Sequence, residues 1–270
     1  MKVEKILFHI GIVFCIVLLF ATVAAPIIAP NDPYKLDIKT KLSPSSAEFP
    51  LGTDHLGRCL YSRLLYGART SLGMACLVLI VTFAIGLVVG IASGLFADRF
   101  IDKALTALCE IVLAFPGILL ALVIASVLGP GIMNIMLAIA LVSWAKYARL
   151  VRTLTIGIKN ADFIRAAKVS GTTPFMIVVR HILPNMLNTI ITVLVSDIGS
   201  TILRVAGLSF IGLGAQPPEA EWGMMINEAR IYITSTPRLI LYPVLAVSIT
   251  VLTFNLLGDG LQSRFAKQYW

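Results

Sequence analysis

Charged side chains are scarce in this sequence. Only 13% of its 270 residues are charged, against roughly a quarter in an ordinary soluble domain. Hydrophobic residues make up 58%, and the mean hydropathy is +0.91. This composition excludes a typical soluble protein and predicts an all-α integral membrane protein.

Motifs for nucleotide binding and catalysis are also missing. No Gly-Lys dipeptide occurs, so the chain has no GxxxxGK[ST] loop to hold ATP phosphates. It has no GxSxG, no HExxH and no plausible Ser/His/Asp set. We therefore expect a transport subunit that is not an enzyme and has no catalytic residues. Its energy source must then lie on other chains or in an ion gradient.

Cysteine and histidine are too few and too scattered for a metal or disulfide framework. None of the four cysteines forms a CxxC pair or another metal-type spacing. His9, His55 and His181 are far apart in the chain. The sequence predicts no metal site on this protein.

The net charge of +8 is concentrated beside apolar runs rather than spread over the chain. The positive-inside rule assigns such a cluster to the cytoplasmic side of a membrane. We therefore expect a bacterial plasma-membrane protein that contacts lipid head groups and no nucleic acid. The cluster that decides this contains seven positive residues against Asp162 alone: Lys146, Arg149, Arg152, Lys159, Arg165, Lys168 and Arg180.

Six apolar runs predict six transmembrane helices. Lys2 and Lys5 precede the first run, which is too long for the core of an ordinary signal peptide and is expected to be retained. The two lysines place the N-terminus in the cytoplasm. An even number of spans returns the C-terminus to the same side. The expected spans are residues 6–26, 70–97, 104–128, 132–154, 186–213 and 239–258.

The segment between the first two spans is polar, proline-rich and expected to lie outside the cell. Its end, Leu51 to Leu72, has leucines on one face and predicts an amphipathic helix along the membrane interface. A surface scaffold and a ligand contact are both open for it. The chain thus divides into residues 1–69, with the first span and this segment, and residues 70–270. The second part is a five-helix core carrying a cytoplasmic loop, residues 155–185, called the basic loop below.

Within the spans, small and charged residues mark particular faces. Gly86, Gly90 and Gly94 recur every fourth residue and predict a smooth seam for close helix packing. Pro116 predicts a kink in the third span. A later loop holds Trp222, an expected membrane-interface anchor, and Met224, expected to pack there rather than to bind metal.

Besides the residues of the positive cluster, three charged residues fall within the expected spans. Glu110 lies near the cytoplasmic end of the third span. Asp197 and Arg204 are seven residues apart, on one helical face and about 10 Å along the axis. Charges at this depth line a cavity or meet another protein group. They can form a substrate path or a structural charge pair within or between subunits.

The basic loop reads as two short helices joined at a glycine. Asn160 or Asp162 can cap a first helix from about Phe163, and Gly171 ends it. The remaining signals are a shared face of Phe163, Ala166, Ala167 and Ser170, a cap at Thr173 followed by Pro174, and a closing Leu183-Pro184-Asn185. This arrangement predicts a docking element for a partner.

The same loop resembles the EAA motif of ABC-importer permeases, EAA-x3-G-x9-I-x-L-P. Arg165 stands where the motif has Glu, and His181 where it has Ile. Other stretches resemble the peptide and nickel branch, although Cys59 stands where that branch commonly has Asp. The matching residues are Ala166, Ala167, Gly171, Leu183 and Pro184, and the stretches are Leu51–Arg58, Gly207–Gly214 and Phe254–Gly260.

The resemblance implies the transmembrane domain of a type I ABC importer. Its expected partners are a second, homologous permease subunit, two ABC ATPase subunits and an extracellular or periplasmic binding protein. ATP and Mg would be bound by the ATPases, and no cofactor by this chain. The implied ATPase-coupling residues are Phe163, Arg165, Ala166, Ala167, Ser170, Gly171, Leu183 and Pro184.

The cargo is less sharply indicated. Residues 143–149 and 220–227 resemble the C subunit of nickel permeases, which favours nickel or a metal chelate over dipeptides and oligopeptides. Glu219, Glu221 and Glu228 would suit a cationic cargo or simply a solvated loop. An ion-gradient-driven transporter is a further alternative, with Glu110, Asp197 and Asp259 as ion sites, but the halves show no inverted repeat.

Overall fold

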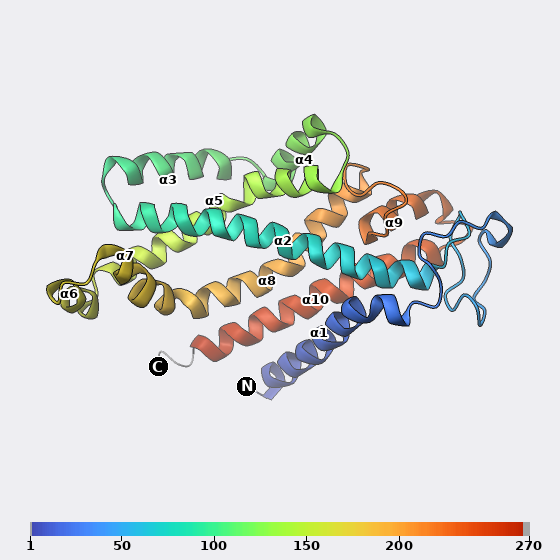
Figure 1. Ribbon diagram of the computed structural model, residues 1–270, viewed down its shortest axis with the longest axis horizontal. Coiled ribbons are helices and arrows are strands. Elements are labelled where there is room, and N and C mark those ends of the chain that lie inside the picture. The colour runs from blue at the N-terminus through green and yellow to red at the C-terminus, as the bar shows by residue number, and fades with distance from the viewer. Residues whose placement is uncertain (1, 267–270) are drawn as a thin grey trace.

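The computed structural model describes residues 2–266, and within that range it contains helices and no strand. Figure 1 shows an elongated bundle of long helices, with irregular segments at one end and α6 and α7 at the other. The helices are α1 (Lys2–Ile28), α2 (Leu60–Leu95), α3 (Phe100–Leu113), α4 (Gly117–Leu128), α5 (Ile132–Lys159), α6 (Asp162–Val169), α7 (Pro174–Ile177), α8 (Leu183–Phe210), α9 (Trp222–Ala229) and α10 (Arg238–Ala266). Short turns lie at Ile38–Thr40, Val178–Ile182 and Arg230–Tyr232.

The number of spans agrees with the sequence when one broken helix is counted. Five helices of the described chain are each long and apolar enough to cross a membrane. The sixth is the pair α3 and α4, which bends by 85° at the break between Leu113 and Gly117. The expected kink at Pro116 is therefore a sharp break. Pro116 precedes the first residue of α4, and its missing N–H cannot continue α3.

The separate interfacial helix expected over Leu51–Leu72 is wrong. Residues from Leu60 onward run directly into α2, a single helix of 36 residues, so the expected division at residue 69 falls inside a helix. The amphipathic pattern has a different cause, because this part of α2 is covered by protein. A Cβ added to Gly67 would lie 2.7 Å from the Trp222 ring, which shows how closely α9 packs here.

The predicted glycine seam joins α2 to α5. A Cβ on Gly86 would lie 2.5 Å from Cβ of Tyr147, and one on Gly94 would lie 2.5 Å from Cβ of Thr155. Any side chain at these two positions would push the helices apart. The absence of side chains therefore lets α2 and α5 touch along the halves that lie nearer to α6.

The segment Leu183-Pro184-Asn185 does not close the basic loop as expected. Residues from Pro174 to Phe210 form one continuous helical run, with a π turn at Val178–Ile182 just before Pro184. A proline inside a helix removes one backbone hydrogen bond and crowds the preceding turn, and a π turn is one way to accommodate it. The second helix of the basic loop and the fifth span are thus mechanically continuous.

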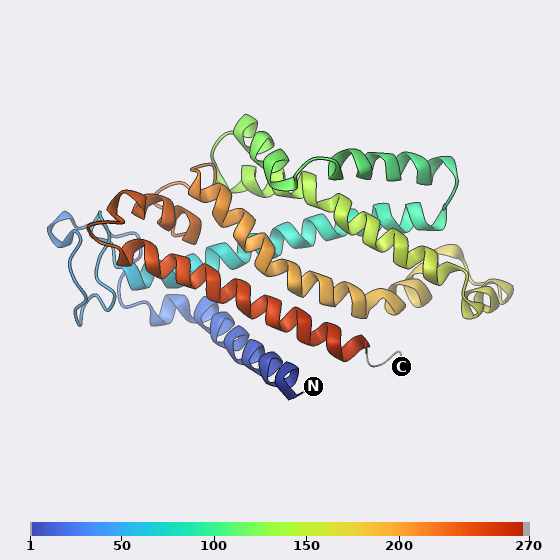
Figure 2. The same cartoon turned by 180° about the vertical axis from the view of Figure 1, so that it is seen from behind.

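The first turns of α1 and the last turns of α10 lie on one side of the bundle. In Figures 1 and 2, both lie toward the end that carries α6 and α7, and away from the irregular segments. α1 packs against α10, and α10 against α8. This arrangement agrees with the prediction that the termini and the basic loop share one side.

Candidate functional site

The first candidate site is the basic loop at the end of the bundle. α6 spans Asp162–Val169, close to the predicted helix, but neither Asn160 nor Asp162 caps it. The N-cap is Ala161, which makes no side-chain cap. Asp162 lies in the first turn instead, where a negative charge favours the helix dipole. Its ion pair with Arg165, at 3.6 Å, is exposed on both sides and contributes little.

One residue anchors α6 to the bundle. Ile164 is fully buried and belongs to a cluster with Val151 of α5 and Met186 of α8. The predicted coupling face lies largely on the other side: Phe163, Ala166 and Ser170 are exposed, and Ala167 is half-buried. The short helix is therefore held from behind while its small and aromatic side chains face outward.

Gly171 forms the sharp turn after α6, as predicted. Its φ is +80°, a conformation that side chains other than glycine rarely adopt. A Cβ placed there would meet nothing within 4 Å, so the backbone conformation, and not space, requires the glycine. Thr173 then caps α7 by accepting a hydrogen bond from the Met176 N–H at 3.4 Å, with Pro174 in the first turn.

Two further apolar side chains extend this surface and were not predicted. Val169 is 90% exposed and Phe175 is 75% exposed. His181 and Phe163 lie near each other, with ring centroids 6.4 Å apart. Leu183 is half-buried and Pro184 is exposed. Exposed apolar side chains gathered on a basic loop are typical of a protein interface.

The second candidate site is the seam between α5 and α8. Asp197 accepts hydrogen bonds at 2.7 Å from Lys146 Nζ and from the Tyr147 hydroxyl. Arg204 donates to Ser143 Oγ at 3.2 Å. Asp197 and Arg204 do share one face, but each is bonded to α5 rather than to the other. The structural alternative of a charge pair within the subunit therefore has a specific partner, Lys146.

A cavity adjoins this charge pair. Its volume is about 560 Å³, and its lining comes from α5, α8 and α10: Lys146, Asn188, Thr189, Thr192, Val193, Ser196, Asp197, Gln262 and Phe265. Glu110 is not among these residues. It is exposed on α3 and lines a separate cavity of about 350 Å³ with Arg149 and Arg152. The structure therefore brings Asp197 and Arg204 to one seam and leaves Glu110 elsewhere.

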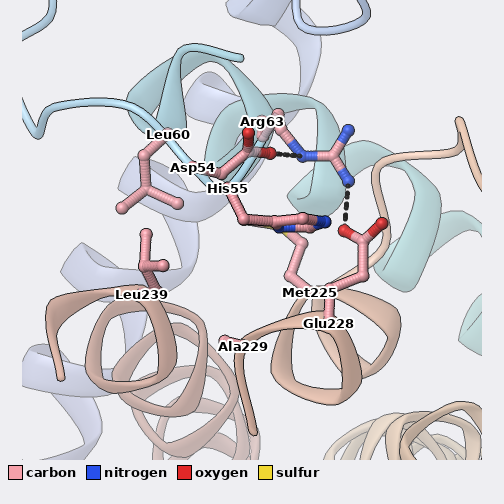
Figure 3. Close-up of a pocket in the computed structure, with 8 residues that line it drawn as sticks. All are labelled: Asp54, His55, Leu60, Arg63, Met225, Glu228, Ala229 and Leu239. Carbon is pink, nitrogen blue, oxygen red and sulfur yellow. Dashed lines mark hydrogen bonds and ion pairs between the residues drawn. The ribbon is translucent and has the colours of Figure 1, made fainter. Parts of the chain in front are cut away.

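The opposite end of the bundle holds a buried ion-pair network. Arg58 Nε lies 2.6 Å from Asp54 Oδ2, and Arg58 Nη2 lies 2.8 Å from Glu228 Oε2. Arg63 Nη2 is 3.2 Å from the same Glu228 oxygen, and Figure 3 shows Arg63 between the two carboxylates. Both arginine side chains are 1% exposed. Two positive and two negative charges thus tie the segment before α2, and the first turn of α2, to α9.

This network also explains why a histidine near two carboxylates is a poor metal site. His55, Asp54 and Glu228 place ligand atoms within 4.8 Å of one another, although the sequence spacing gave no hint of it. Both carboxylates are already bound by arginines, which would repel a cation. The His55 ring stacks on Tyr232 at 5.6 Å, and burial lowers its pKa below the ordinary 6.5.

The loop before α10 differs from the expected membrane-interface anchor. Trp222 is only 2% exposed and donates its indole N–H to the Leu64 carbonyl at 3.0 Å. Glu221 is fully buried and caps α9 by accepting from the N–H groups of Gly223 and Met224. Met224 is buried as well. Of the three acidic residues considered for a cationic cargo, only Glu219 is exposed.

Comparison with known proteins gives the family. Residues 86–270 match the model of the binding-protein-dependent transport system inner membrane component. The chain is 42% identical over 237 residues to the nickel transport system permease protein NikC of Escherichia coli strain K12, covering 87% of this chain and 84% of that protein. It is 42% identical over 219 residues to the glutathione transport system permease protein GsiD of Pectobacterium atrosepticum, covering 81% and 72%.

The exposed basic loop, the helical bundle with its apolar spans and these similarities agree with one another. None of these observations supports the alternative of an ion-gradient-driven transporter of another family. The chain belongs to the family of binding-protein-dependent transport system inner membrane components, and it is a multi-pass membrane permease subunit of an ABC importer.

Proposed function

We propose that this permease imports nickel or a metal chelate, driven by ATP hydrolysis on two separate ATPase subunits. These subunits bind the basic loop of this chain and the corresponding loop of the second permease. A binding protein delivers the cargo from outside, and a second, homologous permease completes the path. ATP and Mg belong to the ATPases. The observation that carries this proposal is the outward face of α6, anchored from behind by the fully buried Ile164.

The anchoring of α6 would let it act as a lever, that is, transmit its movement to the membrane helices. Ile164 packs against residues of both α5 and α8, so a push on α6 reaches two membrane helices directly. Helical structure continues from Pro174 to Phe210 without interruption. A displacement of the basic loop would therefore be carried along α8 to Asp197 and Arg204, the proposed path residues. Glu110, in its separate cavity, is kept only as a further candidate for the path.

The proposed orientation places the basic loop and both termini in the cytoplasm of a bacterial cell. Positive charges flank the helix ends at that side, as the positive-inside rule requires. Residues 70–270 would then form the permease core. Residues 1–69 would supply the first span, the extracytoplasmic segment and the first turns of α2.

The similarities support two cargo classes. NikC is a nickel transport system permease and GsiD a glutathione transport system permease, each 42% identical to this chain. Coverage and identity do not separate the two classes, because the GsiD protein of Escherichia coli O6:K15:H31 covers 92% of this chain at 40% identity. The choice of nickel or its chelates rests on residues 143–149 and 220–227, which resemble the C subunit of nickel permeases. A peptide cargo is the second candidate. It is supported by two glutamates near α9, because Glu221 is buried and Glu228 is bound by arginines, so neither offers a free carboxylate to a cation.

A substitution of Gly171 tests whether α6 transmits movement to the membrane helices. Gly171→Val forces a β-branched residue into a left-handed conformation, at a cost of about 1–2 kcal/mol, with no steric clash. We expect the complex to assemble and hydrolyse ATP while uptake falls severalfold, since the turn that orients α6 is distorted. The matched control is Gly157→Val, at an exposed helical position near the same loop with equally open surroundings. Equal uptake by both variants would refute the lever.

A further inference from the structure

The ion pair between α5 and α8 lies near the middle of both helices, so Lys146 lies deeper than the cytoplasmic cluster to which the sequence assigned it. Lys146 is midway along α5 (Ile132–Lys159) and Asp197 is midway along α8 (Leu183–Phe210). The Asp197 carboxylate is nearly enclosed, with a side-chain exposure of 12%, whereas the Lys146 side chain is 47% exposed. The pair therefore presents its positive member to the surface and hides its negative member.

Polar residues supply most of the wall of the cavity beside Lys146. Asn188, Thr189, Ser196 and Gln262 lie along its wall, and polar groups at membrane depth face water, protein or cargo. Its volume of about 560 Å³ falls within the range of small-molecule sites, roughly 300–1,000 Å³. The cavity thus has the size and the hydrogen-bonding side chains to receive a small polar cargo within the bilayer.

Arg204 adds a second positive charge to the same seam. It lies on the same face of α8 as Asp197, about 10 Å farther along the axis, and its hydrogen bond goes to the neutral Ser143 hydroxyl. Among the described residues, no carboxylate lies within ion-pair distance of Arg204. The seam therefore holds two cations and one carboxylate, an excess that attracts anions and repels a bare divalent cation.

We infer that Lys146 and Arg204 select a cargo that carries a carboxylate, either a peptide with a free C-terminus or a metal bound by a carboxylate chelator. This inference rests on the proposed import function and narrows its cargo. Lys146 would donate a remaining N–H to the cargo carboxylate while its other bonds stay on Asp197. Arg204 would hold a carboxylate with its free guanidinium N–H groups.

The test compares cargo forms in the complete transporter, reconstituted with its binding protein and ATPases in vesicles. Four labelled probes are used: a tripeptide, its C-terminal amide, free nickel ion and nickel with excess citrate. Because the binding protein is the same throughout, a variant-dependent change in the preference for the carboxylate form belongs to the permease. Arg204→Gln should reduce that preference about tenfold, the effect of one charge-assisted hydrogen bond.

Two further variants make the result specific. Lys146→Gln combined with Asp197→Asn removes the exposed ammonium without leaving a lone buried charge, so it should lower the preference even if Arg204→Gln fails to assemble. Arg230→Gln removes an exposed cation directly after α9, outside both cavities, and should leave the preference unchanged.

The outcomes separate the two proposals. If the intact complex imports none of the probes in an ATP-dependent manner, the proposed function fails. If it imports them but the preference is the same in the intact complex, Arg204→Gln and the double variant, only the present inference is overturned. An equal loss in Arg230→Gln would also overturn it, because the effect would then reflect overall charge.

Discussion

The seam between α2 and α5 offers a quantitative test of the packing. Gly90 has no room for a side chain: a Cβ there would lie 2.6 Å from both the Ala148 carbonyl oxygen and Cβ of Val151. Neither atom can turn away, because one is backbone and the other is fixed to it. Gly90→Ala therefore has to separate the helices locally. Gly73, on the same helix, would meet nothing within 4 Å.

Comparing Gly90→Ala with Gly73→Ala isolates the contact. Both substitutions raise helix propensity by about the same amount, so that term cancels in the difference. Overpacking a tight site costs typically 1–3 kcal/mol. For a chain of this size, each kcal/mol shifts the melting temperature by about 2–4 °C. We therefore expect Gly90→Ala to melt roughly 2–12 °C below Gly73→Ala.

The assay is thermal unfolding of each purified variant in the same detergent, followed by helical circular dichroism. The unsubstituted protein serves as the reference for both. If the two variants melt at the same temperature, α2 and α5 do not touch at Gly90, and the described bundle is wrong at its centre.

Three further predictions concern buried charges. Arg63→Met leaves Glu228 with one cation instead of two and should destabilise the protein by about 3–5 kcal/mol, visible as a lower melting temperature and reduced membrane levels. Lowering the pH through 6.5 should destabilise the protein. Burial lowers the pKa of His55 in the folded state, so the unfolded chain takes up the proton first. His55→Gln should flatten this part of the plot of melting temperature against pH. Asp102→Asn weakens the paired bonds at 2.6 and 2.8 Å from Arg152 and should make α3 more accessible to protease than in the unsubstituted protein.

Features that depend on neighbouring residues were predictable from the sequence. The turn at Gly171, the cap at Thr173 and the glycine seam all follow from local conformational preference or helical period. The outward face of α6 also follows from period, since Phe163 and Ala166 share one side of any helix. Local rules therefore described the turn, the second cap and the outward face of the basic loop correctly, but they misplaced the first cap and the end of the loop.

Features that depend on which elements meet were not predictable. Helical period places Asp197 on a face but does not say that Lys146, 51 residues away, lies opposite. Arg63 and Glu228 are 165 residues apart, so the first turns of α2 looked like an interfacial helix. The available signal was weak: an unpaired charge in an apolar helix needs a distant partner of opposite sign.

The central claim is that an ATPase subunit, on a separate chain, binds the basic loop. The most direct measurement is thiol-specific photo-cross-linking from Ala166→Cys in the assembled transporter, with the unsubstituted chain reporting the background from its own cysteines. Because Ala166 is exposed on the outward face of α6, we predict a product that contains an ATPase subunit. A product that contains only the binding protein, which lies on the outer side of the membrane, would contradict the account.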